Sequence, residues 1–314
     1  MRTRTSVLLA ALPCALLLSA CGSGTSDDAG DDTRRTHVVA SFYPLAYVTQ
    51  QVGGDLVDVD NLTSPGGEPH DLELAPKQVA AVQEADLVVF EKGFQSAVDH
   101  AVEQAGRDDD TVVDAAGLVT MLPGGEEEGH DHDDDHGHGH AAVDPHLWLD
   151  PTNMVTIAQA VADRLSDLDP SHADTYAANA ESLIAKLTTL DADYTEGLAS
   201  CKNDTIVTSH AAFAYLAKHY GLEQVAIAGI DPSNEPSAGQ LADITDLVRS
   251  THITTIFTEE LVSPAIAKTV ADEAGVKTAT LDPIEGLSDE TKDETYLTLM
   301  ERNLEAIKKA NSCS

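Results

Sequence analysis

The sequence predicts an α/β protein of two lobes, each a parallel sheet flanked by helices, joined by one long rigid helix. Short runs rich in β-branched residues alternate with amphipathic helical segments from about residue 36 onward, an order typical of parallel sheets with helices on both faces. A long helical region interrupts this alternation once, and four more strand-like runs follow it. The body of about 280 residues is large enough for two such lobes.

The first 20 residues have the composition of a secretory signal. Two arginines precede an apolar stretch from Val7 to Leu18, and small residues follow it. The sequence Leu-Ser-Ala-Cys, ending at Cys21, resembles a bacterial lipobox, in which the cysteine becomes the lipidated first residue. We expect residues 1–20 to be a signal peptide and residues 21–35 to be a lipidated flexible tether. An ordinary signal peptide cut nearby is the alternative.

Composition limits where the rest of the chain resides and what it binds. No later apolar stretch approaches the roughly 20 residues that span a bilayer, so we expect an extracytoplasmic body, anchored by lipid to the cytoplasmic membrane. The formal net charge of −36 disfavours nucleic acid and anionic lipid as partners. Once Cys14 and Cys21 are assigned to the signal and the lipid, Cys201 and Cys313 remain, and we expect them to form a structural disulfide in an oxidising compartment.

The N-terminal lobe is expected over residues 36–150. Within it, residues 124–142 combine glycine, acidic residues and five histidines, from which no packed core can be built, and we expect a mobile loop there. The strands of this lobe are expected at residues 37–41, 55–62, 86–90 and 111–115, and its helices at about 44–52, 76–84 and 94–105.

The linking helical region is expected over residues 151–200 and the C-terminal lobe over residues 201–314. From Pro170 onward apolar residues recur at spacings of four, three, four, three and four, which predicts one helix of about seven turns. Such a rigid connection should flex less than open strands. The recurring residues are Tyr176, Ala180, Leu183, Leu187, Leu190 and Tyr194. The second lobe's strands are expected at residues 205–209, 223–229, 253–259 and 276–282, and its helices at 211–219, 237–250, 264–274 and 290–310.

Ligand-type side chains follow several predicted strands, at the carboxyl ends where open α/β sheets bind ligands. His70 follows the second strand, His146 precedes the linking region, and His210 follows the strand at 205–209. Three neutral imidazoles and one carboxylate form a tetrahedral site that suits Zn²⁺, whereas manganese prefers more oxygen ligands. The carboxylates available at the ends of the later strands are those of Glu259, Asp282 and Glu285.

Other residues are candidates to support these histidines. Glu68, Asp150 and Glu259 could each orient an imidazole, because histidines bound to metal commonly donate their other N–H to a carboxylate. For Glu68 and Asp150 a helix cap or a solvated charge is the alternative. Trp148 and its neighbour Leu147 are expected to pack beneath His146.

The candidate ligands lie in four motifs: "GGEPHDLELAP", "DPHLWLDP", "SHAAFAYLAKHYGL" and "LDPIEGL". Together these resemble the cluster A-I substrate-binding lipoproteins of metal ABC importers, in particular the zinc-uptake branch, over nearly the whole mature chain. The resemblance implies metal ligands at His70, His146 and His210, and a membrane permease with its ATPase as partners. It favours zinc, because manganese members tend to carry glutamate where His210 stands. The fourth ligand stays open between Glu285, which we prefer, and Asp282.

The histidine run "GHDHDDDHGHGH" is expected to act separately from this site. Fixing a flexible segment around one ion costs about 1–2 kcal/mol per residue, so the run should bind metal weakly and gather ions for the cleft. A His-rich loop with this role is also what the resemblance implies. The alternative is a solvated acidic loop with incidental metal affinity. The histidines concerned are His130, His132, His136, His138 and His140.

The function predicted from these observations is capture of Zn²⁺ by a monomeric binding protein that is not an enzyme. A zinc hydrolase would need an open coordination position and a general base, and the chain has no HExxH or HxxEH pattern. A surface adhesin is the other rival class, since relatives of this family have been described as adhesins. Within the binding class, manganese or iron is the alternative ligand.

Overall fold

The computed structural model describes residues 35–124 and 143–314. The predictions for the signal peptide, for lipidation at Cys21 and for the histidine run lie outside the described residues. The described residues from both ranges belong to one compact unit. No helix in the described ranges is both long and apolar enough to cross a membrane.

The N-terminal lobe is a four-stranded parallel sheet in the order β2-β1-β3-β4. Its central strand β3 is buried along its whole length and reads Leu-Val-Val-Phe, as expected for a strand covered by helices on both faces. The edge strand β2 instead alternates valine with aspartate. The elements are β1 (Thr36–Ala40), α1 (Tyr43–Gly53), β2 (Val57–Asn61), α2 (Pro76–Glu84), β3 (Leu87–Phe90), α3 (Ser96–Ala105) and β4 (Val112–Asp114).

The C-terminal lobe repeats this architecture with the strand order β10-β9-β7-β8, again entirely parallel. The two sheets confirm the predicted α/β class and its two lobes. The elements are β7 (Thr205–Thr208), α6 (Ala214–Tyr220), β8 (Glu223–Ala226), α7 (Ala238–Ser250), β9 (Thr255–Thr258), α8 (Ala265–Ala274), β10 (Lys277–Thr280) and α9 (Tyr296–Asn311).

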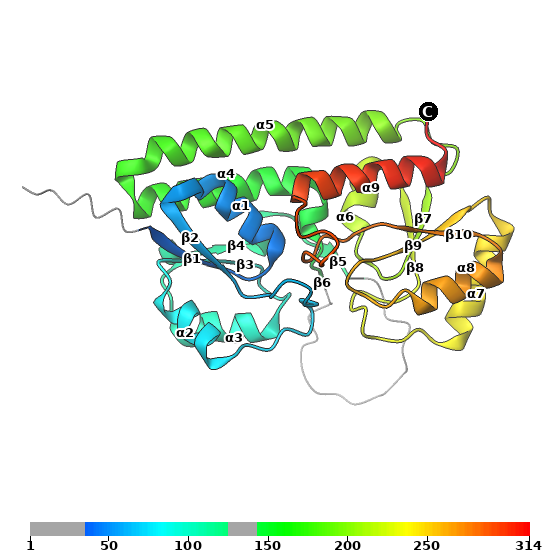
Figure 1. Ribbon diagram of the computed structural model, residues 1–314, viewed down its shortest axis with the longest axis horizontal. Coiled ribbons are helices and arrows are strands. Elements are labelled where there is room, and N and C mark those ends of the chain that lie inside the picture. The colour runs from blue at the N-terminus through cyan, green and yellow to red at the C-terminus, as the bar shows by residue number, and fades with distance from the viewer. Residues whose placement is uncertain (1–34, 125–142) are drawn as a thin grey trace, which may run out of the picture. The chain divides into compact units, whose positions relative to one another are not determined.

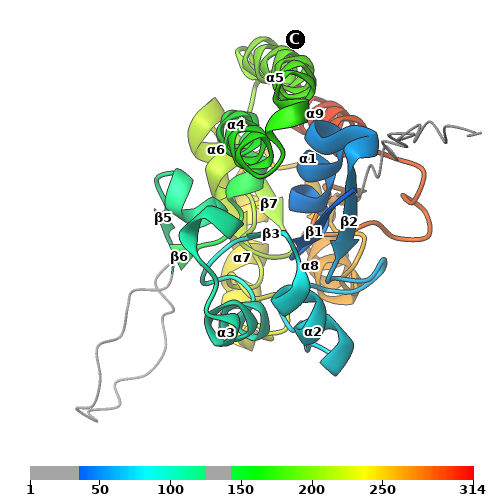
Figure 2. The same ribbon diagram turned by 90° about the vertical axis from the view of Figure 1, so that its left-hand side faces the viewer.

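The two lobes are linked by α4 (Pro151–Leu168) and the 26-residue α5 (Ala173–Leu198). Helix α5 packs against α1 and α4 at one end and against α9 at the other, so it lies along both lobes (Figures 1 and 2). Its buried face is the predicted apolar stripe, together with Leu198. Asn179 donates to the carbonyl of Val52 at 2.9 Å, and the Tyr194 hydroxyl donates to that of Met300 at 2.7 Å. These bonds fasten α5 to each lobe.

One apolar core runs through both lobes and the helices that link them. It contains Val38 and Leu87 of the first sheet, Tyr176 and Leu187 of α5, and Ile307 of α9. Because packed interiors resist deformation, this shared core supports the predicted rigidity of the connection.

Three short features were not anticipated. Strands β5 (Leu122–Pro123) and β6 (Val143–Asp144) form an antiparallel pair on either side of residues 125–142. Helix α9 begins at Tyr296 rather than near residue 290, because the Thr295 hydroxyl caps it by accepting from the N–H of Thr298 at 3.2 Å. Single 3₁₀ turns occur at η1 (Gly54–Leu56), η2 (Asp109–Thr111), η3 (Ala115–Leu118), η4 (Leu147–Leu149) and η5 (Pro170–His172).

A disulfide joins Cys201 to Cys313. It links the residues after α5 to the end of α9. The backbone reinforces the same junction, since the N–H groups of Lys202 and Asn203 both donate to the carbonyl of Asn311.

Candidate metal centre

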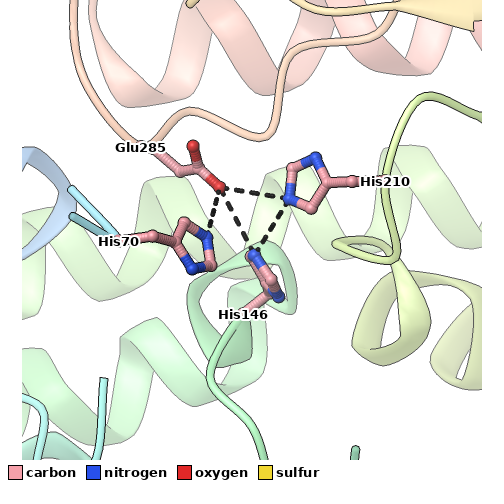
Figure 3. Close-up of side chains that lie close together, drawn as sticks. All are labelled: His70, His146, His210 and Glu285. Carbon is pink, nitrogen blue, oxygen red and sulfur yellow. Dashed lines mark hydrogen bonds and ion pairs between the residues drawn. The ribbon is translucent and has the colours of Figure 1, made fainter. Parts of the chain in front are cut away.

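Four side chains from separate segments meet between the two sheets: those of His70, His146, His210 and Glu285. One potential ligand atom of each lies within 4.8 Å of the other three, and Figure 3 shows the imidazoles and the carboxylate pointing toward a common centre. The segments follow β2, β6, β7 and β10, respectively. The side chains of His146, His210 and Glu285 are fully buried, and that of His70 is 7% exposed.

The spacing of these atoms fits a small tetrahedral cation. Glu285 Oε1 lies 3.4 Å from His70 Nε2, 3.3 Å from His146 Nε2 and 3.4 Å from His210 Nε2. The Nε2 atoms of His146 and His210 are 3.2 Å apart. A tetrahedral ion with bonds of about 2.0–2.1 Å separates its ligand atoms by about 3.3 Å. These four separations therefore match four of the six edges of such a coordination tetrahedron.

Two of the four residues, His70 and Glu285, carry buried polar atoms with no hydrogen-bond partner. His70 Nε2 and both carboxylate oxygens of Glu285 are buried without a hydrogen bond. Leaving a buried carboxylate without hydrogen bonds is costly, and buried charges are as a rule paired or bound to metal. Of these atoms, His70 Nε2 and Glu285 Oε1 face the common centre (Figure 3), so the donor set fits a bound cation.

Asp144 orients His146. Its Oδ1 atom lies 2.7 Å from His146 Nδ1 and accepts from the His146 backbone N–H at 2.9 Å. Nδ1 is thereby engaged, and Nε2 faces the centre. Sequence reasoning missed Asp144, although an acidic residue two positions before a candidate ligand was a usable signal.

Glu259 holds His210 in the same way. Its Oε2 atom lies 2.8 Å from His210 Nδ1, and its Oε1 atom accepts from the His210 backbone N–H at 3.1 Å. His146 and His210 are thus each held by a buried carboxylate, which contacts both the ring nitrogen Nδ1 and the backbone N–H of the same histidine. This leaves Nε2 free to bind an ion.

His70 is supported differently. The Glu68 carboxylate accepts from the backbone N–H of His70 at 3.1 Å and of Asp71 at 3.4 Å, and its Oε1 atom lies 4.0 Å from His70 Nε2. The ring of Phe94 packs edge-on against the imidazole, with centroids 4.8 Å apart at an angle of 89°. Glu68 therefore fixes the loop rather than the ring.

Of the roles considered for Asp150, the structure shows the helix cap. Asp150 is the N-cap of α4, where its Oδ1 atom accepts from the Thr152 N–H at 2.8 Å. Its Oδ2 atom lies 2.8 Å from Nδ1 of His219, and Nε2 of the same ring lies 3.2 Å from Oδ1 of Asp191. Asp150 thus takes the helix-cap role, and His219 joins α6 to α4 and α5.

Of the two candidate acidic ligands, the structure places Glu285 in the cluster and Asp282 behind it. Asp282 Oδ1 accepts from the Ile284 N–H at 2.8 Å, and Asn303 bonds both backbone groups of Asp282, at 2.9 and 2.6 Å. Ile284 has a φ of 59°, an uncommon conformation for a β-branched residue. This tight turn directs Glu285 toward the imidazoles, while burial raises the pKa of Asp282 to about 7.

Aromatic side chains pack beneath the imidazoles of the site. The Trp148 ring lies 5.2 Å from that of His146, 4.7 Å from Phe42 and 5.5 Å from Phe94. Its indole N–H donates to the carbonyl of Pro283 at 2.7 Å. Trp148 and the neighbouring Leu147 are fully buried. Trp148 therefore packs beneath His146 and also holds the turn that carries Glu285.

The site retains protons when no cation is present. Burial opposes a charged imidazole, but the hydrogen bond to Asp144 and the Glu285 carboxylate 3.3 Å away outweigh it and raise the pKa of His146. For His210 burial is likewise outweighed, by Glu259 and Glu285, and the pKa rises to about 10. Burial also opposes ionisation of Glu285, yet the three imidazoles hold its pKa well below the usual range. An incoming cation must displace these protons.

Comparisons with known proteins agree with this geometry. Residues 38–310 match the family model described as "ZnuA: Zinc-uptake complex component A periplasmic". The chain is 41% identical over 308 residues to the zinc-binding lipoprotein AdcA of Streptococcus pneumoniae (strain ATCC BAA-255 / R6), covering 97% of this chain and 60% of AdcA. It is 39% identical over 302 residues to the high-affinity zinc uptake system protein ZnuA of Bacillus subtilis (strain 168), covering 94% of both.

Solved structures give the same result. The Zn(II)-bound ZnuA-like domain of Streptococcus pneumoniae AdcA superposes with a TM-score of 0.75 at 38% identity, covering 88% of this chain and 99% of that domain. The laminin-binding protein Lmb of Streptococcus agalactiae is described as bifunctional, with adhesin and metal-transporting activity. Its structure superposes with a TM-score of 0.75 at 33% identity, covering 88% of this chain and 99% of Lmb. The chain spans about three-fifths of full-length AdcA. With the family model matching most of its length, the chain belongs to the family of zinc-uptake complex component A proteins.

Proposed function

We propose that this protein captures Zn²⁺ outside the cytoplasmic membrane and delivers it to a membrane permease driven by an ATPase. The observation that carries the proposal is the convergence of three Nε2 atoms and one carboxylate oxygen at tetrahedral spacing in a buried centre. His70, His146, His210 and Glu285 are the proposed ligands. Membership of a zinc-uptake family and the Zn(II)-bound structure of a relative support zinc as the cargo.

The ligand set favours zinc over manganese or iron, and binding over catalysis. Three nitrogen atoms and one oxygen suit Zn²⁺, whereas Mn²⁺ is better served by oxygen ligands in octahedral geometry. The described side chains supply all four positions of a tetrahedral ion, so no position is left for an activated water of the kind that zinc hydrolases use.

The proposed organisation follows from the position of the site. Lobes over residues 36–150 and 201–314 would close around the ion, with residues 151–200 linking them, and docking on the permease would separate the ligands. Closure on zinc requires only that the closed state bind the ion better than the open state. We propose that lipidation of Cys21 and the tether over residues 21–35 hold a monomer at the membrane surface, and that residues 130–140 gather zinc for the cleft.

Metal analysis tests the proposal. Protein purified without chelators should carry one tightly bound zinc per chain, and competition should show zinc preferred over manganese. A preference for manganese, or a chain that binds no zinc tightly, would contradict it.

A further inference from the structure

Among the four proposed ligands, only the side chain of His70 keeps contact with solvent in the part of the chain that the structure describes. The other three ligand side chains are fully buried, whereas the side chain of His70 is 7% exposed and that of the adjacent Glu68 is 25% exposed. The loop that carries both residues contacts the opposite lobe, since the N–H of Gly66 donates to the carbonyl of Leu287 at 2.8 Å. An ion that arrives from solvent therefore meets Glu68 and His70 before it meets the buried ligands.

Glu68 keeps unused acceptor capacity toward this opening. A carboxylate offers about four lone-pair sites, and the two backbone N–H groups of His70 and Asp71 occupy only part of that capacity. Its Oε1 atom lies 4.0 Å from His70 Nε2, so an ion about 2 Å from Nε2 can also be within bonding reach of Glu68. Movement of the ion from the carboxylate to the imidazole therefore needs only a short step.

A second carboxylate, that of Asp231, lies in the C-terminal lobe close to the segment of His210, since Gly229, two residues before Asp231, accepts through its carbonyl from the N–H of Ala211 at 3.0 Å. Asp231 lies in the segment after β8, where its Oδ1 atom accepts from the Ser233 N–H at 2.8 Å. Partial burial raises the pKa of Asp231. Hydrogen bonds from Ser233, and the charges of the nearby His70 and His210, outweigh this effect, so the pKa of Asp231 is lowered overall. Each lobe thus places one partly exposed carboxylate near the imidazoles.

We propose that Glu68 is an entrance carboxylate, the first protein ligand of the incoming cation, which then passes to His70 and the buried ligands while Asp231 attracts it from the opposite lobe. This inference rests on the proposed function. Hydrated Zn²⁺ exchanges one water for a Glu68 oxygen and another for His70 Nε2. It then leaves Glu68 as His146, His210 and Glu285 complete the tetrahedron, and the imidazole protons pass to solvent. Glu68 remains as the cap of its loop.

The experiment compares Glu68→Gln with Glu73→Gln. Glutamine keeps an oxygen acceptor for the two backbone N–H groups and removes only the charge. Glu73 is exposed on the same segment, so its variant makes an identical change in net charge away from the site. Trp148, the only tryptophan of the chain, lies 5.2 Å from His146 and provides an intrinsic fluorescence signal for stopped-flow mixing with zinc alone.

We expect Glu68→Gln to lower the association rate constant at least about fivefold at low ionic strength, to weaken its salt dependence, and to leave the dissociation rate no faster than in the wild type. Asp231→Asn should give a smaller fall, with exposed Glu235→Gln as its control. Glu73→Gln and Glu235→Gln should bind at the wild-type rate. Equal unfolding midpoints of the metal-free variants establish that the loop and fold are intact.

Three results would overturn the inference. The first is an unchanged association rate in Glu68→Gln, and the second is an equal fall in Glu73→Gln, which would indicate net charge alone. The third is a loss of affinity that comes only from faster dissociation, which would make Glu68 a support of the bound ion. If wild-type protein bound no zinc at all, the proposed function would fail instead, so the two failures are distinguishable.

Discussion

The Nε2 atom of His146 lies 3.3 Å from the Oε1 atom of Glu285, and neither side chain has solvent-exposed surface. The two residues come from different lobes. Beside them, the Trp148 indole donates to the Pro283 carbonyl at 2.7 Å, two residues beyond His146 on one side and two residues before Glu285 on the other. One buried hydrogen bond thus joins the two segments that carry these proposed ligands.

Replacing Glu285, the proposed acidic ligand, should strongly weaken zinc binding, whereas replacing Asp282 should not. We expect Glu285→Gln to weaken zinc binding at least about 100-fold, or ~2.7 kcal/mol, because an amide is a poorer ligand and leaves the cation charge unbalanced. Asp282→Asn retains the Oδ1 acceptor for the Ile284 N–H and should stay within about threefold of the wild type. Competition against a chromophoric chelator measures both. The opposite order would assign the fourth ligand to Asp282.

The carboxylate behind His146 should matter nearly as much as a ligand. We expect Asp144→Asn to reduce zinc affinity about 10–100-fold, because the imidazole would lose the acceptor that fixes Nδ1 and its orientation. Asp150→Asn is the matched control, since Asp150 caps α4 and should leave affinity unchanged. Calorimetric titration of both variants checks this. Equal losses would mean that general charge, rather than orientation, is responsible.

The sequence predicted the sheets well because their residues follow simple rules. Strands covered on both faces, such as β3, are continuous apolar runs, and the stripe on α5 has a helical period. The predicted ends of elements were less accurate where a capping side chain decides the boundary, as Thr295 does at the start of α9. The β5–β6 pair was missed because two-residue strands have no periodicity.

The three proposed histidine ligands and the support from Glu259 could be predicted from the sequence, whereas the choice of acidic residue and the support from Asp144 could not. His70 and His210 follow strands of the two parallel sheets, and topology places the carboxyl ends of parallel strands together. His146 instead follows β6 of the antiparallel pair, so its motif rather than its strand indicated it. Which of Asp282 and Glu285 enters the centre depends on the turn at Ile284, which spacing alone does not specify. Asp144 and Asp150 flank His146 closely in sequence, and only packing shows that the first orients it while the second caps a helix.

Zinc affinity should rise with pH over the whole range from 5 to 9. Zinc binds neutral imidazole, and in the metal-free protein the pKa of His210 is raised to about 10 and that of His146 is raised as well. Each displaced proton should change the apparent dissociation constant about tenfold per pH unit. Titrations in buffers of different ionisation enthalpy count the protons released. An affinity independent of pH would argue against histidine ligation.

Stability of the metal-free protein should show the opposite trend. The folded pKa of His210 exceeds its unfolded value of about 6.5, so its contribution is fully present below that pH and is lost as pH rises toward 10. We therefore expect the metal-free unfolding midpoint to fall between pH 7 and pH 10. The variant His210→Asn should lack this component of the fall. Thermal denaturation followed by circular dichroism in the presence of chelator measures it.

Removing the histidine run should not remove the tight site. A chain lacking residues 126–140 retains all four proposed ligands and both strands of the β5–β6 pair. We expect it to bind one zinc with wild-type affinity and to lose only weaker additional binding. Equilibrium dialysis across a range of free zinc concentrations separates the two classes. Loss of the tight class would place the main site in the run.

The most direct measurement is anomalous diffraction at the zinc edge from crystals grown with zinc. A single strong peak should lie between the lobes, with bonds of about 2.0–2.2 Å to the Nε2 atoms of His70, His146 and His210 and to a Glu285 oxygen. A zinc-free centre, with these side chains turned away from one another or with the ion bound elsewhere, would contradict the account.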